Sequence, residues 1–141
     1  MLNKPTDELL GRLKTDSNID SYIKENEQYF VDGNIAAYLN DIVASKKAVK
    51  SKALKRAEIN ENYGYQIFMG SRKPSRNVLI QLCIGLELDL DETQSALKFA
   101  GFAPLYPKKK RDSIIISGIL ESKTVFEINN ILFDFDEEPL A

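Results

Sequence analysis

The side chains best suited to a chemical task are two amides, Asn62 and Gln66, which lie four residues apart. On a helix this spacing places them one turn apart on the same face. A side-chain amide both donates and accepts hydrogen bonds, which matches the pattern that adenine presents at N6 and N7 in the DNA major groove. The pair therefore predicts base recognition by an exposed helix.

Positive charge gathers around these amides. Residues 46–76 contain nine lysines and arginines against two acidic residues, a net charge of +7, although the whole chain carries −2. A basic cluster of this kind is what a phosphate-binding surface requires, whatever the overall isoelectric point. A solvated basic surface without a ligand is the alternative interpretation.

Two short helices joined by a turn are expected to position these residues. Apolar residues at helical spacing predict the first helix over residues 49–57. Asn60 is a suitable cap for the second helix, which is expected to run to Met69 before Gly70 and Pro74 end it. Two helices connected in this way are typical of a helix-turn-helix.

This run of residues resembles the second half of the Cro and lambda-repressor-like helix-turn-helix family, also called the XRE type. Ile59 matches the apolar turn position, Asn60 the helix cap, and Ile67 the buried residue of the recognition helix. Residues 70–75 match the glycine, basic loop and proline that lead into the next helix. With its flanking helices the resemblance covers roughly residues 34–101, and it implies that helix Asn60–Met69 reads the major groove.

The sequence departs from the family pattern at two places in this helix. Gly64 stands where an aliphatic residue is usual, and Phe68-Met69 replaces a charged pair. A glycine inside a helix costs about 1 kcal/mol relative to alanine. We therefore expect a neighbouring helix to approach Gly64 closely.

The resemblance also implies which side chains touch DNA. The residues expected to contact bases are Asn62, Gln66, Tyr63, Glu61 and Tyr65. For either tyrosine a packing role is an equal alternative, and Glu61 also suits the first turn of a helix. The residues expected to contact phosphates are Lys50, Ser51, Asn60, Arg72, Lys73 and Arg76. About five neutralised phosphates predict a log–log salt slope near −4 to −5.

The whole chain is expected to be all-α, with a compact five-helix repressor-like core between two helical extensions. The predicted parts are an N-terminal extension over residues 1–30, a helix-turn-helix core over residues 31–103 and a C-terminal extension over residues 104–141. Helix caps are predicted in the core at Asn34, Ser75 and Asp89, the last in a capping box with Glu92.

Both extensions carry more apolar residues than an isolated short helix can bury. The N-terminal one has two short helical patterns, with Leu9, Leu10 and Leu13 in the first and Ile19, Tyr22 and Ile23 in the second. Each must dock, either on the core or on a second subunit or partner. The C-terminal helices, predicted over residues 108–121 and 124–134, either close the core or pair with a second copy. The acidic tail, residues 134–138, is expected to be solvated.

Enzyme, metal and cofactor functions are not predicted. The chain has no histidine, one cysteine and no phosphate-binding glycine motif. Cys83 lies on the apolar face of a predicted helix and is expected to be a core residue. No signal-peptide pattern and no run of about 20 apolar residues is present, so we expect a cytoplasmic location.

The sequence thus favours a sequence-specific DNA-binding transcriptional regulator. By resemblance, a dimer would bind two half-sites about 34–36 Å apart. The apolar pattern of the C-terminal helices makes them the candidate contact of such a homodimer. The alternative is a helix-turn-helix domain that serves as a protein-interaction adaptor or antitoxin-like partner. In that case the terminal helices would bind another protein.

Overall fold

The computed structural model describes residue 19 and residues 34–140 of the 141-residue chain. Residues 34–140 form seven α-helices and no strand, which confirms the all-α prediction for this part of the chain. The helices are α3 (Ile35–Lys46), α4 (Lys50–Arg56), α5 (Glu61–Met69), α6 (Arg76–Gly85), α7 (Leu90–Phe99), α8 (Lys110–Leu120) and α9 (Val125–Asp134). Their bounds agree with the helical periodicity of the sequence to within a few residues.

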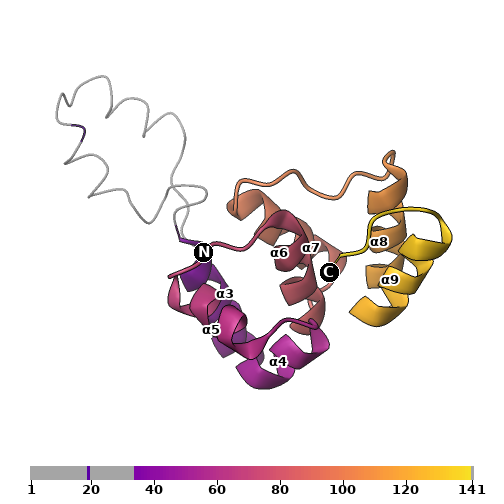
Figure 1. The fold of residues 1–141 in the computed structure, drawn as a ribbon. Coiled ribbons are helices and arrows are strands. Elements are labelled where there is room, and N and C mark those ends of the chain that lie inside the picture. Colours follow the sequence, from indigo (N-terminus) through magenta and orange to yellow (C-terminus); the bar gives the residue numbers. More distant parts are fainter. Residues whose placement is uncertain (1–18, 20–33, 141) are drawn as a thin grey trace.

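Helix α6 is the centre of the packing. It lies against α4, α7 and α9, while α3 packs on α5 and α8 packs on both α7 and α9. Figure 1 shows α3, α4 and α5 at one side of α6 and the α8–α9 pair at the other. The side chains of Leu79, Ile80, Leu82 and Cys83 on α6 are all fully buried. One continuous core therefore joins the two groups of helices.

Side-chain caps fix the starts of two core helices as predicted. The Ser75 hydroxyl accepts from the N–H of Val78 at 3.2 Å, and Asp89 and Glu92 form a reciprocal capping box. The cap predicted at Asn34 is wrong in one respect, because Asn34 precedes α3 but its side chain makes no capping hydrogen bond. Its backbone, at φ −143° and ψ 36°, is not in the extended conformation that directs a cap side chain to the helix N–H groups.

Close helix contacts explain two buried glycines. A Cβ atom at Gly64 of α5 would overlap the fully buried side chain of Leu54 on α4. A Cβ atom at Gly118 of α8 would likewise overlap Ile128 on α9. The expected close approach at Gly64 is confirmed. Helices α8 and α9 approach each other in the same way, with a glycine of one helix beneath a branched side chain of the other.

The α8–α9 pair closes the core with its inner faces and leaves aromatic residues outside. Ile115, Ile128 and Leu132 are fully buried, whereas 64% of Phe126 and 78% of Phe133 are exposed. These helices therefore close the core, which is one of the two alternatives predicted from the sequence.

The C-terminal tail returns to the core instead of extending away from it (Figure 1). Leu140 is buried, and Arg111 donates to the carbonyl oxygens of Glu138 at 2.8 Å and Pro139 at 3.1 Å. The side chains of Asp136 and Glu138 are exposed, as expected for an acidic tail. The backbone of this tail is therefore held although its charges are solvated.

A largely buried ion pair connects the start of α6 to α8. The guanidinium of Arg76 lies 3.1 Å from the carboxylate of Asp112, and the Asp112 side chain is only 6% exposed. The same guanidinium donates to the carbonyl oxygens of Ala103 and Pro104, and the N–H of Tyr106 donates to Asp112. The chain that connects α7 to α8 is thus held by hydrogen bonds to Arg76 and to Asp112.

Cys83 is a fully buried core residue, as predicted. Burial raises the pKa of its thiol to about 12, because a thiolate would lose its hydration there; a hydrogen bond with Thr93 acts in the opposite direction.

None of the helices in the described part of the chain combines the length and apolarity that crossing a bilayer requires. The predicted N-terminal helices lie outside the described residues except for Ile19, which is helical and 55% exposed.

Candidate nucleic-acid interface

A tight turn sets the relation between α4 and α5. Glu58 adopts a left-handed backbone with φ 57°, and the N–H of Ile59 donates to the carbonyl oxygen of Leu54 at 3.0 Å. The side chain of Asn60 then accepts from the N–H of Tyr63 at 3.3 Å, which confirms the predicted cap. The oxygen of Asn60 is therefore engaged, and its NH₂ group is the part that remains for a ligand.

Helix α5 separates cleanly into an inner and an outer face. Gly64, Ile67 and Phe68 are buried against the rest of the core. The outer face consists of exposed residues at helical spacing, namely Glu61, Asn62, Tyr65, Gln66 and Met69. The amide pair Asn62 and Gln66 thus lies on the solvent-facing side of a helix of nine residues. Such a helix is about 14 Å long.

The loop after α5 is folded against the end of the helix. Gly70 has φ +84°, a left-handed conformation that glycine adopts without strain. The N–H groups of Ser71 and Arg72 both donate to the carbonyl oxygen of Gln66, at 3.0 and 3.2 Å. These bonds hold the start of the loop against the C-terminal end of α5, and the side chains of Arg72 and Lys73 are both exposed.

Two cations lie over aromatic rings of α5. The guanidinium carbon of Arg72 is 5.8 Å from the ring centroid of Tyr63, which is half-buried. The ammonium of Lys50 on α4 is 5.1 Å from the ring centroid of Phe68. Such contacts favour a fixed position for the charge. Tyr63 therefore has a packing role, and the start of α4 is brought beside α5 together with the half-buried Ser51.

Three of the nine basic residues in the positive segment are neutralised within the molecule. Lys46 pairs with Glu92 at 3.3 Å, Arg56 with Glu87 at 3.2 Å, and Arg76 with Asp112 at 3.1 Å. Arg76 is unsuited to the phosphate contact expected from the sequence, because carboxylate and carbonyl oxygens already occupy its guanidinium. Sequence reasoning supplied its charge but not its partner.

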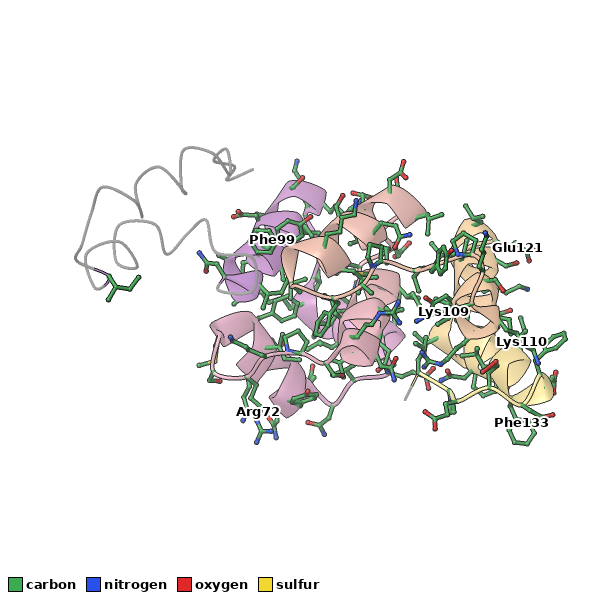
Figure 2. All side chains as sticks on the ribbon, turned by 90° about the horizontal axis from the view of Figure 1, so that it is seen from above. Arg72, Phe99, Lys109, Lys110, Glu121 and Phe133 are labelled. Atoms are coloured by element: carbon green, nitrogen blue, oxygen red, sulfur yellow. The ribbon has the colours of Figure 1, made fainter. Side chains whose placement is uncertain are left out.

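The other six basic residues have no ion pair with any described residue. They are Lys47, Lys50, Lys52, Lys55, Arg72 and Lys73. Figure 2 shows the Arg72 side chain pointing away from the molecule. Lys52 and Lys55 were not among the expected phosphate contacts, although both are exposed on α4. Their spacing of three residues, which places them on one helix face, is a signal that the sequence already contained.

A second feature, which the sequence did not indicate, is a groove between α3 and α7. It has a volume of about 410 Å³, and the rings of Tyr38 and Phe99 stack in it with centroids 4.5 Å apart. Burial raises the pKa of the Tyr38 hydroxyl, and the nearby Cys83 and Glu92 act in the same direction. The groove lies on the side of α3 opposite Asn40, whose NH₂ group donates to the carbonyl oxygen of Phe68 on α5 at 2.8 Å.

No protein-family model, curated protein or solved structure matches the chain. Within residues 34–140, no three His, Cys, Asp or Glu side chains come together in a way that could hold a metal ion. The geometry of the α4–α5 surface is therefore the basis for a functional proposal.

Proposed function

We propose that the chain is a sequence-specific DNA-binding regulator of the Cro/lambda-repressor-like type, with helix α5 in the major groove of double-stranded DNA. The observation that carries the proposal is the outer face of α5. It presents the amides of Asn62 and Gln66 between cations from α4 and from the loop at Arg72 and Lys73. Amides suit base edges and cations suit the flanking phosphates.

The dimensions of the α4–α5 unit support the same proposal. An α-helix with its side chains is about 10–12 Å across, which fits a major groove about 12 Å wide. Asn62 and Gln66 would read adenine, while Tyr65 and Glu61, both exposed, would lie within reach of neighbouring bases. Contacts from Lys50, Arg72 and Lys73 would fix the register of the helix without reading sequence.

Dimerisation is the second part of the proposal. Phe126 and Phe133 lie seven residues apart on α9, and both side chains are largely exposed. This spacing places them on one helix face two turns apart. A self-complementary contact through this face would join two copies and present two α5 helices to two half-sites.

The first experiment is selection from a random library of DNA duplexes at two salt concentrations. A regulator of this type enriches a motif, and a palindromic motif would report a dimer. Salt-sensitive binding without a motif would contradict the base-reading role of α5. Absence of binding at low salt would refute DNA binding altogether.

Variants separate the phosphate contacts from the base contacts. Replacing Lys50 and Arg72 by alanine should weaken binding to all sequences alike and make the log–log salt slope about 2 less negative. Replacing Lys98 and Lys108 is the matched control, because both are exposed lysines outside the proposed surface. Equal losses in the two double variants would mean that the charge effect is not local to the α4–α5 surface.

Changes at the amides should alter sequence preference instead. Asn62→Ala or Gln66→Ala should reduce discrimination at one base pair by about 1–3 kcal/mol. Ser117→Ala is the control, because this polar side chain is exposed on α8. Unchanged preference in both α5 variants would show that the docking mode is wrong.

An adaptor or antitoxin-like function is the second candidate, and the exposed apolar residues at the end of α8 and on and just after α9 favour it. The side chains of Leu120, Phe126, Phe133 and Phe135 are each at least half exposed. Aromatic residues are enriched where proteins bind one another. If the chain binds no DNA but Phe126→Ser and Phe133→Ser abolish capture of one specific protein, this second function replaces the first.

A further inference from the structure

The groove between α3 and α7 has an apolar floor and acidic walls. Its floor includes Ala37, Tyr38, Ile42 and Phe99. Asp41 stands on the α3 wall and Asp91 on the α7 wall, and both are exposed. Neither makes an ion pair with any residue that the structure describes. An amphipathic helix with basic flanks would complement these features.

We propose that residues 6–14 of the same chain occupy this groove as a short amphipathic helix. In the sequence, Leu9, Leu10 and Leu13 fall on one face of such a helix. In the second half of this helix Arg12 and Lys14 then project about 100° to either side of that face, because successive residues of an α-helix are rotated by about 100°. The acidic Asp7 and Glu8 stand in its first turn, where a carboxylate suits the helix N-terminus. The three leucines would contact the floor of the groove.

The two basic residues match the two acidic walls. With the leucines on the floor, Arg12 would face one wall and Lys14 the other, so that each is within reach of Asp41 or Asp91. Glu92, which also lines the groove, is already paired with Lys46 at 3.3 Å. The two acids that pair with no described residue, Asp41 and Asp91, thus lie one on each wall, and one basic residue of the segment would face each of them.

The connection to the core also fits. Asn34, where the described part of the chain resumes, itself lines the groove. Residues 15–33 form a link of 19 residues. Such a link can span up to about 60 Å, whereas α3 with its 12 residues is about 18 Å long. The segment can therefore reach the groove of its own chain in either direction, and a short tether favours this over a second copy.

Docking of this segment is independent of the proposed DNA binding. The groove residues Tyr38, Asp41 and Ile42 lie on the face of α3 opposite Asn40, which contacts α5. An occupied groove therefore leaves Asn62 and Gln66 exposed. Failure of one proposal would not imply failure of the other.

Paramagnetic relaxation enhancement on the full chain tests the proposal. A spin label on Ser95→Cys, an exposed groove residue, should remove most of the amide signal intensity of Leu9, Leu10 and Leu13. The same label on Glu121→Cys, an exposed position at the end of α8 that Figure 2 shows far from Phe99, is the control and should leave these signals intact. Cys83 is fully buried and should take no label. Intact signals with the Ser95→Cys label would overturn the proposal.

Two further measurements sharpen this test. In a mixture of isotope-labelled chains without spin label and spin-labelled chains without isotope, the leucine signals should remain. Their loss would show that a second copy supplies the segment and would overturn docking within one chain.

Arg12→Glu and Asp41→Lys should each reduce the broadening, and the double variant should restore part of it. Identical broadening in all three would refute the charge pairing.

Discussion

The two helices of the α4–α5 pair and of the α8–α9 pair are held together by the same kind of contact, but the two pairs expose side chains of different chemistry. In each pair a buried glycine lies beneath a branched side chain of the other helix, Gly64 beneath Leu54 and Gly118 beneath Ile128. The first pair presents amides and cations that form no ion pair within the described part of the chain. The second presents exposed phenylalanines, and residues 124–140 contain five acidic and no basic side chains.

The difference separates what builds the fold from what selects a partner. The inner faces of both pairs are closed by similar contacts against α6, which packs on α4 and on α9. The outer faces are free to differ, because exposed residues contribute little to stability. Changes on an inner face should therefore act on the free energy of unfolding, whereas changes on an outer face should act on binding.

The largest effect on stability is expected at the ion pair that connects α6 to α8. Arg76→Met leaves Asp112 largely buried without its cation, which should cost about 3 kcal/mol of unfolding free energy in urea denaturation. Lys46→Met is the matched control, because its pair with Glu92 is more exposed and should cost at most about 1 kcal/mol. Equal losses would show that burial of the pair does not hold the α8–α9 pair to the core.

The two glycines should respond alike if the helix pairs are built alike. Gly64→Ala and Gly118→Ala should each destabilise by about 1–3 kcal/mol, because the added methyl overlaps a fully buried side chain. Trimming the neighbour in the double variant Gly64→Ala/Leu54→Val should recover part of the loss. Ser117→Ala, an exposed position on α8, is the control for helix propensity. A stabilised Gly64→Ala variant would mean that α5 can move away from α4 at no cost.

The thiol of Cys83 lies on α6, the helix that packs against both pairs, and its ionisation gives a pH-dependent measure of stability at that helix. Below pH 9 the thiol is protonated in both states, so its contribution to stability is complete. As the pH rises from 9 towards 12, the unfolded chain loses the proton first, and stability should fall by up to about 1.4 kcal/mol per pH unit. The Cys83→Ala variant has no thiol and should not show this pH-dependent loss of stability. Stability curves of the two proteins that stay parallel up to pH 10.5 would show that the thiol ionises while still folded.

Local features were predictable from the sequence because they depend on neighbouring residues. The helices follow apolar spacing over three or four residues, and the caps at Asn60, Ser75 and Asp89 act over three residues. The close approach at Gly64 followed from the unfavourable propensity of glycine, which a helix tolerates when a neighbour needs the space. For the candidate interface, the exposure of Asn62 and Gln66 followed from the same periodicity.

Features that depend on distant residues were not predictable. Arg76 belongs to the basic segment by sequence, yet its partner Asp112 lies 36 residues further on. The α3–α7 groove likewise requires two helices whose stacked rings, Tyr38 and Phe99, are 61 residues apart in the sequence. Charge and polarity can be read from residue types alone. Whether a charge is free for a ligand depends on the tertiary fold.

The smallest effect on stability, and the sharpest test of the division, is expected at the outer faces. Phe133 on α9 and Met69 on α5 are 78% and 79% exposed. Phe133→Ser and Met69→Ser should each change the unfolding free energy by no more than about 0.5 kcal/mol. Figure 2 shows Phe133 on the outer side of the α8–α9 pair, well away from Arg72.

Sedimentation equilibrium should then distinguish these two variants. If α9 joins two copies, Phe133→Ser should shift the chain towards monomer, and adding Phe126→Ser should complete the shift. Met69→Ser should leave the association unchanged, because it lies on the face proposed for DNA. If the Met69→Ser variant dissociates instead, the α5 face would be the contact between copies. It would then be covered in the dimer, and the α9 face would be left for a different partner.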